Sequence, residues 1–185
     1  IVTGMHLSPE FGLTYKEVEK DFKIDRKVEM LISSDSSVGI SKAMGIAQIS
    51  FAETYEELKP DIIVALGDRY EIFSAVSAAM IARIPIAHLH GGEATEGLID
   101  ESIRHSITKM SNIHFVSNNQ YKTRVAQLGE EMKNIHTVGP MVIDNLIDIN
   151  FLTKSELCKL LDIDKLDSFF LITLHPETYG MKNNL

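Results

Sequence analysis

The chain has 185 residues, of which 44% are apolar, and its 18 basic and 26 acidic residues give a formal net charge of −8. A chain of this length with a mean hydropathy near zero can bury a sizeable core, so we expect one full domain or slightly more. The acidic balance argues against nucleic acid or an anionic membrane as a general partner. Any anionic ligand must therefore be met by local groups.

The compartment is indicated by cysteine usage and by the lengths of the apolar runs. The single cysteine, Cys158, lies in a helical pattern beside Leu157 and Leu160, which predicts a buried thiol in a reducing compartment. No apolar run is long enough to span a bilayer. We therefore expect a cytoplasmic protein.

Both ends of the sequence have the pattern of strands without neighbours. Residues 1–4 resemble the end of a buried strand with nothing before it, and residues 169–174 form an apolar run with nothing after it to pair with. We expect the chain to be a fragment of a longer protein.

Strand and helix patterns alternate between those ends. Strands are expected at 1–4, 28–32, 62–66, 84–90, 114–116, 135–138 and 169–174, and helices at 13–20, around 40–47, 51–58, 70–82, 101–110, 120–128, 142–149 and 155–161. The helix around 40–47 has apolar residues at i, i+3, i+4 and i+7 from Ile40, and serines at 33–37 can cap it. Pro60 ends the next helix. This alternation predicts an α/β fold with a doubly wound parallel sheet.

Reactive side chains concentrate where two buried strands end. The run 62–66 is followed by Asp68 and Arg69, and the run 84–90 is followed by two glycines and Glu93. Ligands of open α/β sheets bind outside the carboxyl ends of the strands, so both turns are expected to face one crevice.

Asp68 and Arg69 stand where a buried strand meets the start of a helix, a position that favours anions. Arg69 can bind a phosphate there through two parallel hydrogen bonds. The alternative is structural: Asp68 only caps the helix, and Arg69 pairs with Glu71 or Asp61.

His88 and His90 are two residues apart on a predicted strand, so their side chains are expected on the same face. With Glu93, Asp100 and His105 they can supply the mixed imidazole and carboxylate ligands that suit zinc or iron. The remaining ligands follow no fixed spacing, and a metal site is kept only as an alternative.

Asp100 precedes the helix expected at 101–110, on which Arg104 and His105 lie one turn later. An acid at a helix start is often a cap, and an arginine four residues on often forms a surface pair with it. Carboxylates near imidazoles and an arginine are also what proton transfer beside a leaving phosphate needs. Arg104 is therefore a candidate for substrate contact. His175 follows the last predicted strand and can meet a ligand or serve the structure.

The chain carries four motifs in this order: GDRYE at 67–71, HLHGGE at 88–93, IDESIRHSITKM at 99–110 and LHPET at 174–178. Together they closely resemble the hydrolysing UDP-N-acetylglucosamine 2-epimerases that make N-acetylmannosamine for sialic acid synthesis. The resemblance covers essentially the whole chain. It implies the GT-B arrangement of two Rossmann-like domains facing a cleft. Residues 1–148 would form the first domain without its opening strand, and residues 149–185 would begin the second.

The reaction of the family that the chain resembles removes UDP from C1 with loss of the C2 proton, giving a glycal to which water adds with inversion at C2. These steps need a base, an acid and local positive charge. By analogy, the catalytic residues are Asp68, Glu93 and Asp100 with support from His90 and His105, and the substrate-binding residues are Arg69, His175, His6 and Arg104. No metal or other cofactor is implied, because the redox state of the sugar is unchanged.

Several alternatives stay open beside this resemblance. Related bacterial enzymes act on a 2,4-diacetamido sugar on the route to legionaminic acid, so the C4 substituent is not decided. Non-hydrolysing 2-epimerases share the fold but usually carry an acidic residue in place of His90. A metal-dependent hydrolase using His88, His90 and His105, and a nucleotide-sugar binding module without turnover, are the remaining possibilities.

The partners expected from the resemblance are a UDP-sugar substrate and further copies of the chain, as a homo-oligomeric dimer or tetramer. The family holds the uridine in the second domain. The fragment alone is therefore expected to bind UDP poorly.

Overall fold

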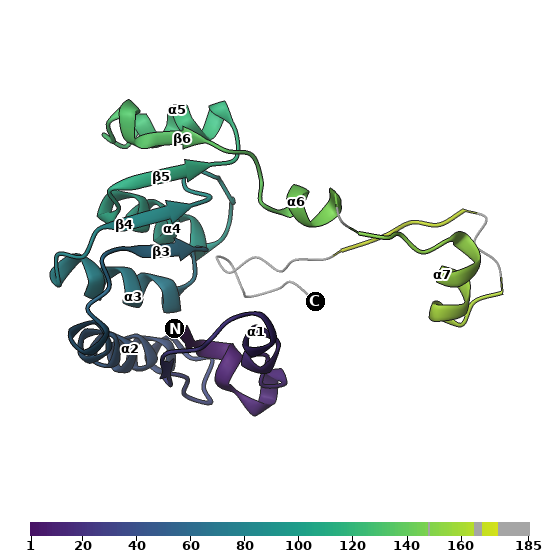
Figure 1. Ribbon diagram of the computed structural model, residues 1–185, viewed down its shortest axis with the longest axis horizontal. Helices are drawn as coiled ribbons and strands as arrows, with labels where there is room; N and C mark the ends of the chain where they lie inside the picture. Colours follow the sequence, from purple (N-terminus) through teal and green to yellow (C-terminus); the bar gives the residue numbers. More distant parts are fainter. Residues whose placement is uncertain (148, 165–167, 174–185) are drawn as a thin grey trace.

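Strands and helices alternate along the chain, as the sequence pattern predicts (Figure 1). The computed structural model describes residues 1–147, 149–164 and 168–173. Its strands are β1 (Val2–Thr3), β2 (Lys27–Val28), β3 (Ile63–Leu66), β4 (Ile86–Leu89), β5 (Ile113–Val116) and β6 (Ile135–Thr137). Its α-helices are α1 (Tyr15–Asp21), α2 (Ser37–Leu58), α3 (Tyr70–Ile81), α4 (Ile99–Met110), α5 (Asn119–Gln127), α6 (Val142–Ile147) and α7 (Lys154–Leu161). Three short 3-10 helices are η1 (Gly4–Leu7), η2 (Pro9–Phe11) and η3 (Met132–Asn134).

The main sheet has four parallel strands in the order β3-β4-β5-β6, and β1 and β2 form a separate parallel pair (Figure 1). In the register of the main sheet, His88 of β4 lies between Ala65 of β3 and His114 of β5. Parallel strands end at the same edge of a sheet, so the turns after β3, β4 and β5 are neighbours. The expected α/β class with a parallel sheet is confirmed.

Helices pack against one face of β3 and β4. The main core joins them to α2, α3 and α4 through side chains such as Phe51, Val76 and Ile86, each at most 3% exposed. Successive side chains of a strand point to opposite faces. Ala65 accordingly lies in this core, whereas its neighbour Val64 is 65% exposed on the other face of β3.

A smaller core packs α5 against β5 and β6. Val125 of α5 packs against Val116 of β5 and Ile135 of β6, and all three are at most 1% exposed. The chain segment between β5 and α5 is thereby held at the edge where the strands end.

The prediction of two helices before Pro60 was wrong. α2 runs from Ser37 to Leu58 as one helix of 22 residues, because residues 46–58 contain no glycine or proline that would end it. The predicted serine cap is confirmed, since the side chain of Ser36 accepts a hydrogen bond from the backbone N–H of Gly39.

Other boundaries also differ from those expected. β2 contains only Lys27–Val28 instead of 28–32, because its partner β1 offers two residues before the chain turns into η1. α4 begins at Ile99, so Asp100 lies in its first turn instead of preceding it. Cys158 is a free thiol and is half-buried in α7, not buried. Residues 168–173 form no strand, and Leu174 lies outside the described residues.

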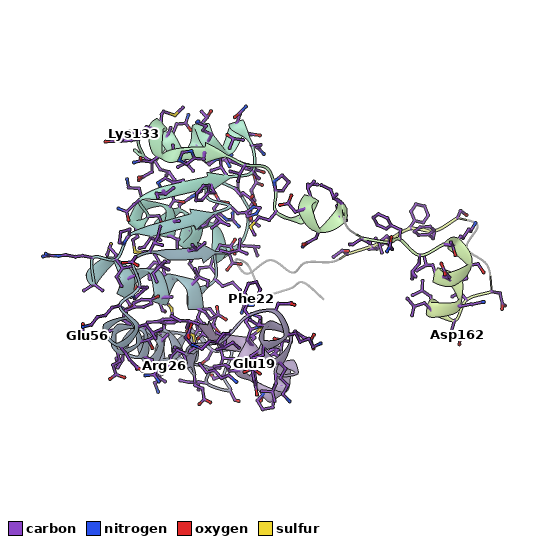
Figure 2. All side chains as sticks on the ribbon, in the orientation of Figure 1. Glu19, Phe22, Arg26, Glu56, Lys133 and Asp162 are labelled. Carbon is purple, nitrogen blue, oxygen red and sulfur yellow. The ribbon has the colours of Figure 1, made fainter. Side chains whose placement is uncertain are left out.

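The chain leaves the main body after β6. Figure 1 shows α6 and α7 set apart from the sheet, and Figure 2 places Asp162, which follows α7, far from Lys133 beside β6. α7 begins with a reciprocal cap in which Thr153 and Glu156 each accept a backbone N–H of the other residue. No helix in the described part of the chain is long and apolar enough to cross a membrane. A domain boundary near residue 148 remains a prediction.

Candidate active site

Arg104 joins three segments at the edge where the strands end. It projects from α4 and is only 7% exposed. Its Nη2 pairs with Oδ2 of Asp68 in the turn after β3, and its Nη1 donates to the carbonyl oxygen of Glu93 at 2.9 Å and to Oγ1 of Thr95 at 3.2 Å. Both turns therefore face one site, as expected.

These contacts answer two of the structural alternatives. Asp68 does not cap α3: the residue at the N-cap position is Arg69, and α3 has no side-chain cap. The surface pair between Asp100 and Arg104 is not formed either, because Arg104 turns inward to Asp68 instead of lying along its own helix.

Glu93 is held by two side chains from neighbouring strand ends. Its Oε1 lies 2.8 Å from Nδ1 of His90 and accepts a hydrogen bond from Oγ of Ser117 at 3.1 Å. His90 follows β4 directly and has a φ of +63°, a left-handed conformation that is uncommon for a residue other than glycine and clusters at functional sites. Its backbone N–H donates to the carbonyl of Phe115 at 2.8 Å, which anchors the turn to β5.

Asp100 lies in the first turn of α4, beside this network. Partial burial, followed by the negative charge of Asp68, raises its pKa, while Arg69 and Arg104 oppose the shift. Asp100 and Asp68 are thus close enough to interact electrostatically. Asp100 keeps its proton to a higher pH than an ordinary aspartate and is suited to donate one.

The loop that carries Glu93 is fixed through its backbone. Arg124 of α5 donates to the carbonyl of Gly92, and Glu101 of α4 accepts the backbone N–H of Thr95 at 2.8 Å. Gly92 has a φ of +80°, and a Cβ there would lie 2.6 Å from the backbone oxygen of Tyr121, so only glycine fits. These contacts hold the backbone of the loop on both sides of Glu93.

His105 lies one turn after Glu101 on α4, with Nε2 at 3.8 Å from Oε1 of Glu101. Burial lowers the pKa of His105, and Glu101 opposes that shift. His105 thus favours the neutral imidazole and lies at the rim of the network, where it is linked to the loop that carries Glu93 through Glu101 and the backbone of Thr95.

Arg69, which follows Asp68 of this network, lines a large cavity. The cavity has a volume of about 920 Å³ and is lined by residues of η1, η2, the loop at 29–35 and the start of α3. Nη2 of Arg69 lies 3.3 Å from Oε1 of Glu71, as the structural alternative proposed. The Arg69 side chain is still 48% exposed, so it can also meet an anion.

The remaining candidate histidines lie outside this network or outside the described residues. His6 lies in η1 and bonds Oγ1 of Thr14 at 2.8 Å, with no described contact to the network. His175 lies outside the described residues. His88 is fully buried, with Nδ1 at 3.2 Å from Oγ1 of Thr108 on α4, whereas His90 reaches Glu93, so the two do not share a ligand site.

No three His, Cys, Asp or Glu side chains in residues 1–147, 149–164 and 168–173 are grouped so that they can hold a metal ion. The metal-hydrolase alternative thus gains no geometric support.

Ser117 and Arg124 are among the network residues that were missed in the sequence. Ser117 directly follows β5, and the rule that pointed to Asp68 and Glu93, that strand ends face the ligand, also points to Ser117. Arg124 sits inside an ordinary amphipathic helix, and no local pattern distinguishes it from a surface arginine.

Known proteins match this chain along its length. The family model described as UDP-N-acetylglucosamine 2-epimerase matches residues 1–184. The chain is 49% identical over 183 residues to the hydrolysing GDP/UDP-N,N'-diacetylbacillosamine 2-epimerase of Campylobacter jejuni, covering 99% of this chain and 48% of that protein. It is 40% identical over 183 residues to the polysialic acid biosynthesis protein P7 of Escherichia coli, covering 98% of this chain and 46% of that protein. The chain spans about half the length of these relatives.

Solved structures show the same fold. A putative UDP-N-acetylglucosamine 2-epimerase from Listeria monocytogenes superposes with a TM-score of 0.69 at 20% identity, over 84% of this chain and 42% of that one. The UDP-GlcNAc 2-epimerase from Neisseria meningitidis, bound to UDP-GlcNAc, gives a TM-score of 0.65 at 21% identity, over 81% and 39%. With the family model covering residues 1–184, the chain belongs to the UDP-N-acetylglucosamine 2-epimerase family.

Proposed function

We propose that the whole protein is a hydrolysing 2-epimerase that acts on a nucleotide-linked 2,4-diacetamido sugar. The observation that carries the reaction type is the Arg104-centred network, which brings Asp68 and Glu93 together beside Asp100 at the strand ends. The substrate is supported by the relatives. A hydrolysing N,N'-diacetylbacillosamine 2-epimerase of Legionella pneumophila is 34% identical over 95% of this chain, in addition to the Campylobacter protein.

The chemistry assigned to these residues is an elimination followed by a hydration. A carboxylate removes the C2 proton as the bond from C1 to the nucleotide oxygen breaks, and the nucleoside diphosphate leaves. Water then adds its oxygen to C1 of the glycal while C2 receives a proton on the opposite face. Asp68 and Glu93 are the candidates to accept a proton, and Asp100, with its raised pKa, is the candidate to donate one.

Arg69 is assigned to the departing diphosphate. Negative charge develops on the leaving oxygen, and a guanidinium at the start of a helix stabilises it. The half-exposed Arg69 side chain beside the cavity fits this role. His175 is proposed as a second phosphate contact on the basis of the LHPET motif.

UDP-N-acetylglucosamine is the second candidate substrate. The UDP-N-acetylglucosamine 2-epimerase of Neisseria meningitidis serogroup B is 35% identical over 145 residues, which is 78% of this chain. The two candidate sugars differ at C4, where one carries an acetamido group and the other a hydroxyl.

The test compares the turnover of the three candidate substrates. The whole protein is incubated with UDP-N,N'-diacetylbacillosamine, the GDP-linked form and UDP-N-acetylglucosamine in separate reactions, and free sugar and nucleotide are followed by NMR. We expect free epimerised sugar from a diacetamido substrate at the highest kcat/KM. Turnover of UDP-N-acetylglucosamine alone would reassign the substrate, and no release of any nucleotide would contradict the proposed activity.

A further inference from the structure

Ser117 makes a contact that the structure of its own segment does not need. It lies between β5 and α5 and is half-buried. The N-terminus of α5 is already capped by Asn118, whose side chain accepts the backbone N–H of Tyr121 at 3.0 Å. The hydroxyl of Ser117 instead reaches 24 residues back along the chain to Oε1 of Glu93, at 3.1 Å.

The backbone of the Glu93 loop is also held without Ser117. Arg104 binds the carbonyl of Glu93 itself, and Arg124 binds the carbonyl of Gly92. Among the described residues, the Ser117 hydroxyl therefore contacts only the Glu93 carboxylate. The Nδ1 atom of His90 approaches the same carboxylate oxygen at 2.8 Å from the other strand end.

His90 and Ser117 both contact Oε1 of Glu93, which leaves the two oxygens of this carboxylate in different surroundings. The two contacts fix its rotation about the last side-chain bond and, within the described part of the chain, leave Oε2 as the oxygen that can meet a substrate proton. A hydrogen bond donated to a carboxylate stabilises its charged form. The arrangement thus presents one oxygen of Glu93 to a substrate while the other is held.

We infer that Ser117 is a positioning residue that, with His90, orients the Glu93 carboxylate so that its free oxygen accepts a proton in the reaction. The inference rests on the proposed function. Ser117 itself does not touch the reacting atoms and forms no covalent bond. Its effect passes entirely through Glu93.

The test compares two substitutions at Ser117 with a control, in the whole protein and with the substrate that it turns over fastest. Ser117→Ala removes the hydroxyl, and Ser117→Thr keeps it. Ser106→Ala is the matched control, because Ser106 is an exposed serine of α4 whose hydroxyl bonds only the carbonyl of Ser102, at 2.8 Å.

We expect Ser117→Ala to lower kcat/KM about tenfold, the effect of losing one hydrogen bond to a charged group. The acidic limb of its pH profile should move to higher pH, since the carboxylate that must accept a proton has lost a donor. Ser117→Thr should recover most of the activity and the wild-type profile. All variants should melt within a few degrees of the wild type.

Distinct results overturn the inference and the proposed function. An active wild type with Ser117→Ala indistinguishable from Ser106→Ala in rate and pH profile would remove the positioning role while the epimerase assignment stands. A rate loss in Ser117→Ala and Ser117→Thr alike, with an unshifted pH profile, would mark Ser117 as merely structural. A wild type that releases no sugar from any of the three nucleotide sugars would overturn both.

Discussion

The guanidinium of Arg104 forms an ion pair with the carboxylate of Asp68, 36 residues earlier in the chain, and the side chain of Arg104 is only 9% exposed. The other terminal nitrogen of Arg104 binds the carbonyl of Glu93. A single side chain thus ties the first half of α4 to the ends of β3 and β4. It therefore holds the turn that carries Asp68 to the backbone of the turn that carries Glu93.

Removing Arg104 is expected to damage stability as well as activity. Arg104→Gln leaves Asp68 without its ionic partner, and breaking a largely buried pair from one side costs about 3 kcal/mol. Urea unfolding followed by circular dichroism measures this loss. Lys109→Gln is the control, because Lys109 is 51% exposed in its pair with Glu130 and should lose less than about 1 kcal/mol.

The pairing itself is checked by a double-mutant cycle. Residues in direct contact are not additive, so Asp68→Asn combined with Arg104→Gln should cost less than the sum of the two single changes. Additive losses would mean that Asp68 and Arg104 do not stabilise one another in solution.

Asp68→Asn tests the catalytic role of this carboxylate. The side chains are nearly the same size, and loss of an acid-base group lowers turnover by about 100-fold or more. Asp61→Asn is the matched control, because Asp61 is exposed and precedes the opposite end of β3. The assay is release of free sugar by the whole protein. Full turnover by Asp68→Asn would leave Asp68 with a structural role only.

Strand ends predicted the residues of this site correctly, whereas spacing along a helix predicted a wrong contact. The ends of buried strands correctly pointed to Asp68 and Glu93, because parallel strands deliver their carboxyl ends to one edge. Spacing along a helix suggested a pair between Asp100 and Arg104, but helix periodicity contains no information on which face is turned to the sheet at that point.

The boundaries of the strands were also predicted well where they depend on the local sequence and poorly where they depend on a distant partner. Apolar runs identified all four strands of the main sheet to within two residues at each end. The length of β2 was overestimated, because a strand can only be as long as its partner, and the turn at Gly4 that ends β1 is not visible in the sequence of β2. The link between Ser117 and Glu93 likewise joins distant residues.

Arg69→Ala is expected to weaken binding of UDP to the whole protein. A guanidinium bonded to a phosphate contributes roughly 1.5–3 kcal/mol, so the concentration of UDP that inhibits half the activity should rise at least tenfold. Arg26→Ala is a close control: Arg26 also pairs with a glutamate, Glu57, and is 43% exposed, compared with 48% for Arg69. Figure 2 places Arg26 on the α2 side of the molecule, away from the four-stranded main sheet.

Equal inhibition of Arg69→Ala and wild type by UDP would remove Arg69 from the phosphate site. The same measurement on His175→Ala tests the second proposed phosphate contact.

Two imidazoles are buried next to each other in the sheet. His88 of β4 pairs in register with His114 of β5, and both are fully buried. Burial lowers the pKa of His88 from 6.5 to about 4, the nearby backbone of Gly67 opposes the shift, and His114, Arg104 and His90 act in the same direction as burial. Burial also lowers the pKa of His114, against the attraction of Glu130.

These shifts predict a loss of stability in acid. Below about pH 6.5 the unfolded chain takes up protons on these histidines, whereas the folded protein does not. Their contribution to the free energy of unfolding is therefore fully present above that pH and is lost as the pH drops toward 4. His88 alone should cost about 2 kcal/mol between about pH 7.5 and about pH 5. Urea unfolding of the wild type at the two pH values measures it.

His88→Gln should flatten this dependence even though it lowers stability overall, because glutamine does not titrate. His136→Gln, at an exposed position of β6, should retain the full slope. A wild type equally stable at both pH values would contradict the assignment of His88 as a neutral, buried imidazole.

Solvent deuterium and the fate of the nucleotide distinguish a hydrolysing epimerase from a reversible one. Elimination removes the C2 proton, and hydration returns one that has exchanged with water, so sugar formed in D₂O should carry deuterium at C2. Water supplies the new oxygen at C1, and free nucleotide should appear in step with the free epimerised sugar. A reversible epimerase also deuterates C2, but its product keeps the nucleotide. Whether the bond from C1 to the nucleotide oxygen is broken is therefore the decisive observation.

If the nucleotide stays attached, the hydrolysing assignment is wrong, although the site built on Asp68, Glu93 and Asp100 would survive. If C2 keeps its original hydrogen, the elimination itself is wrong, and no carboxylate of this site removes a proton from carbon.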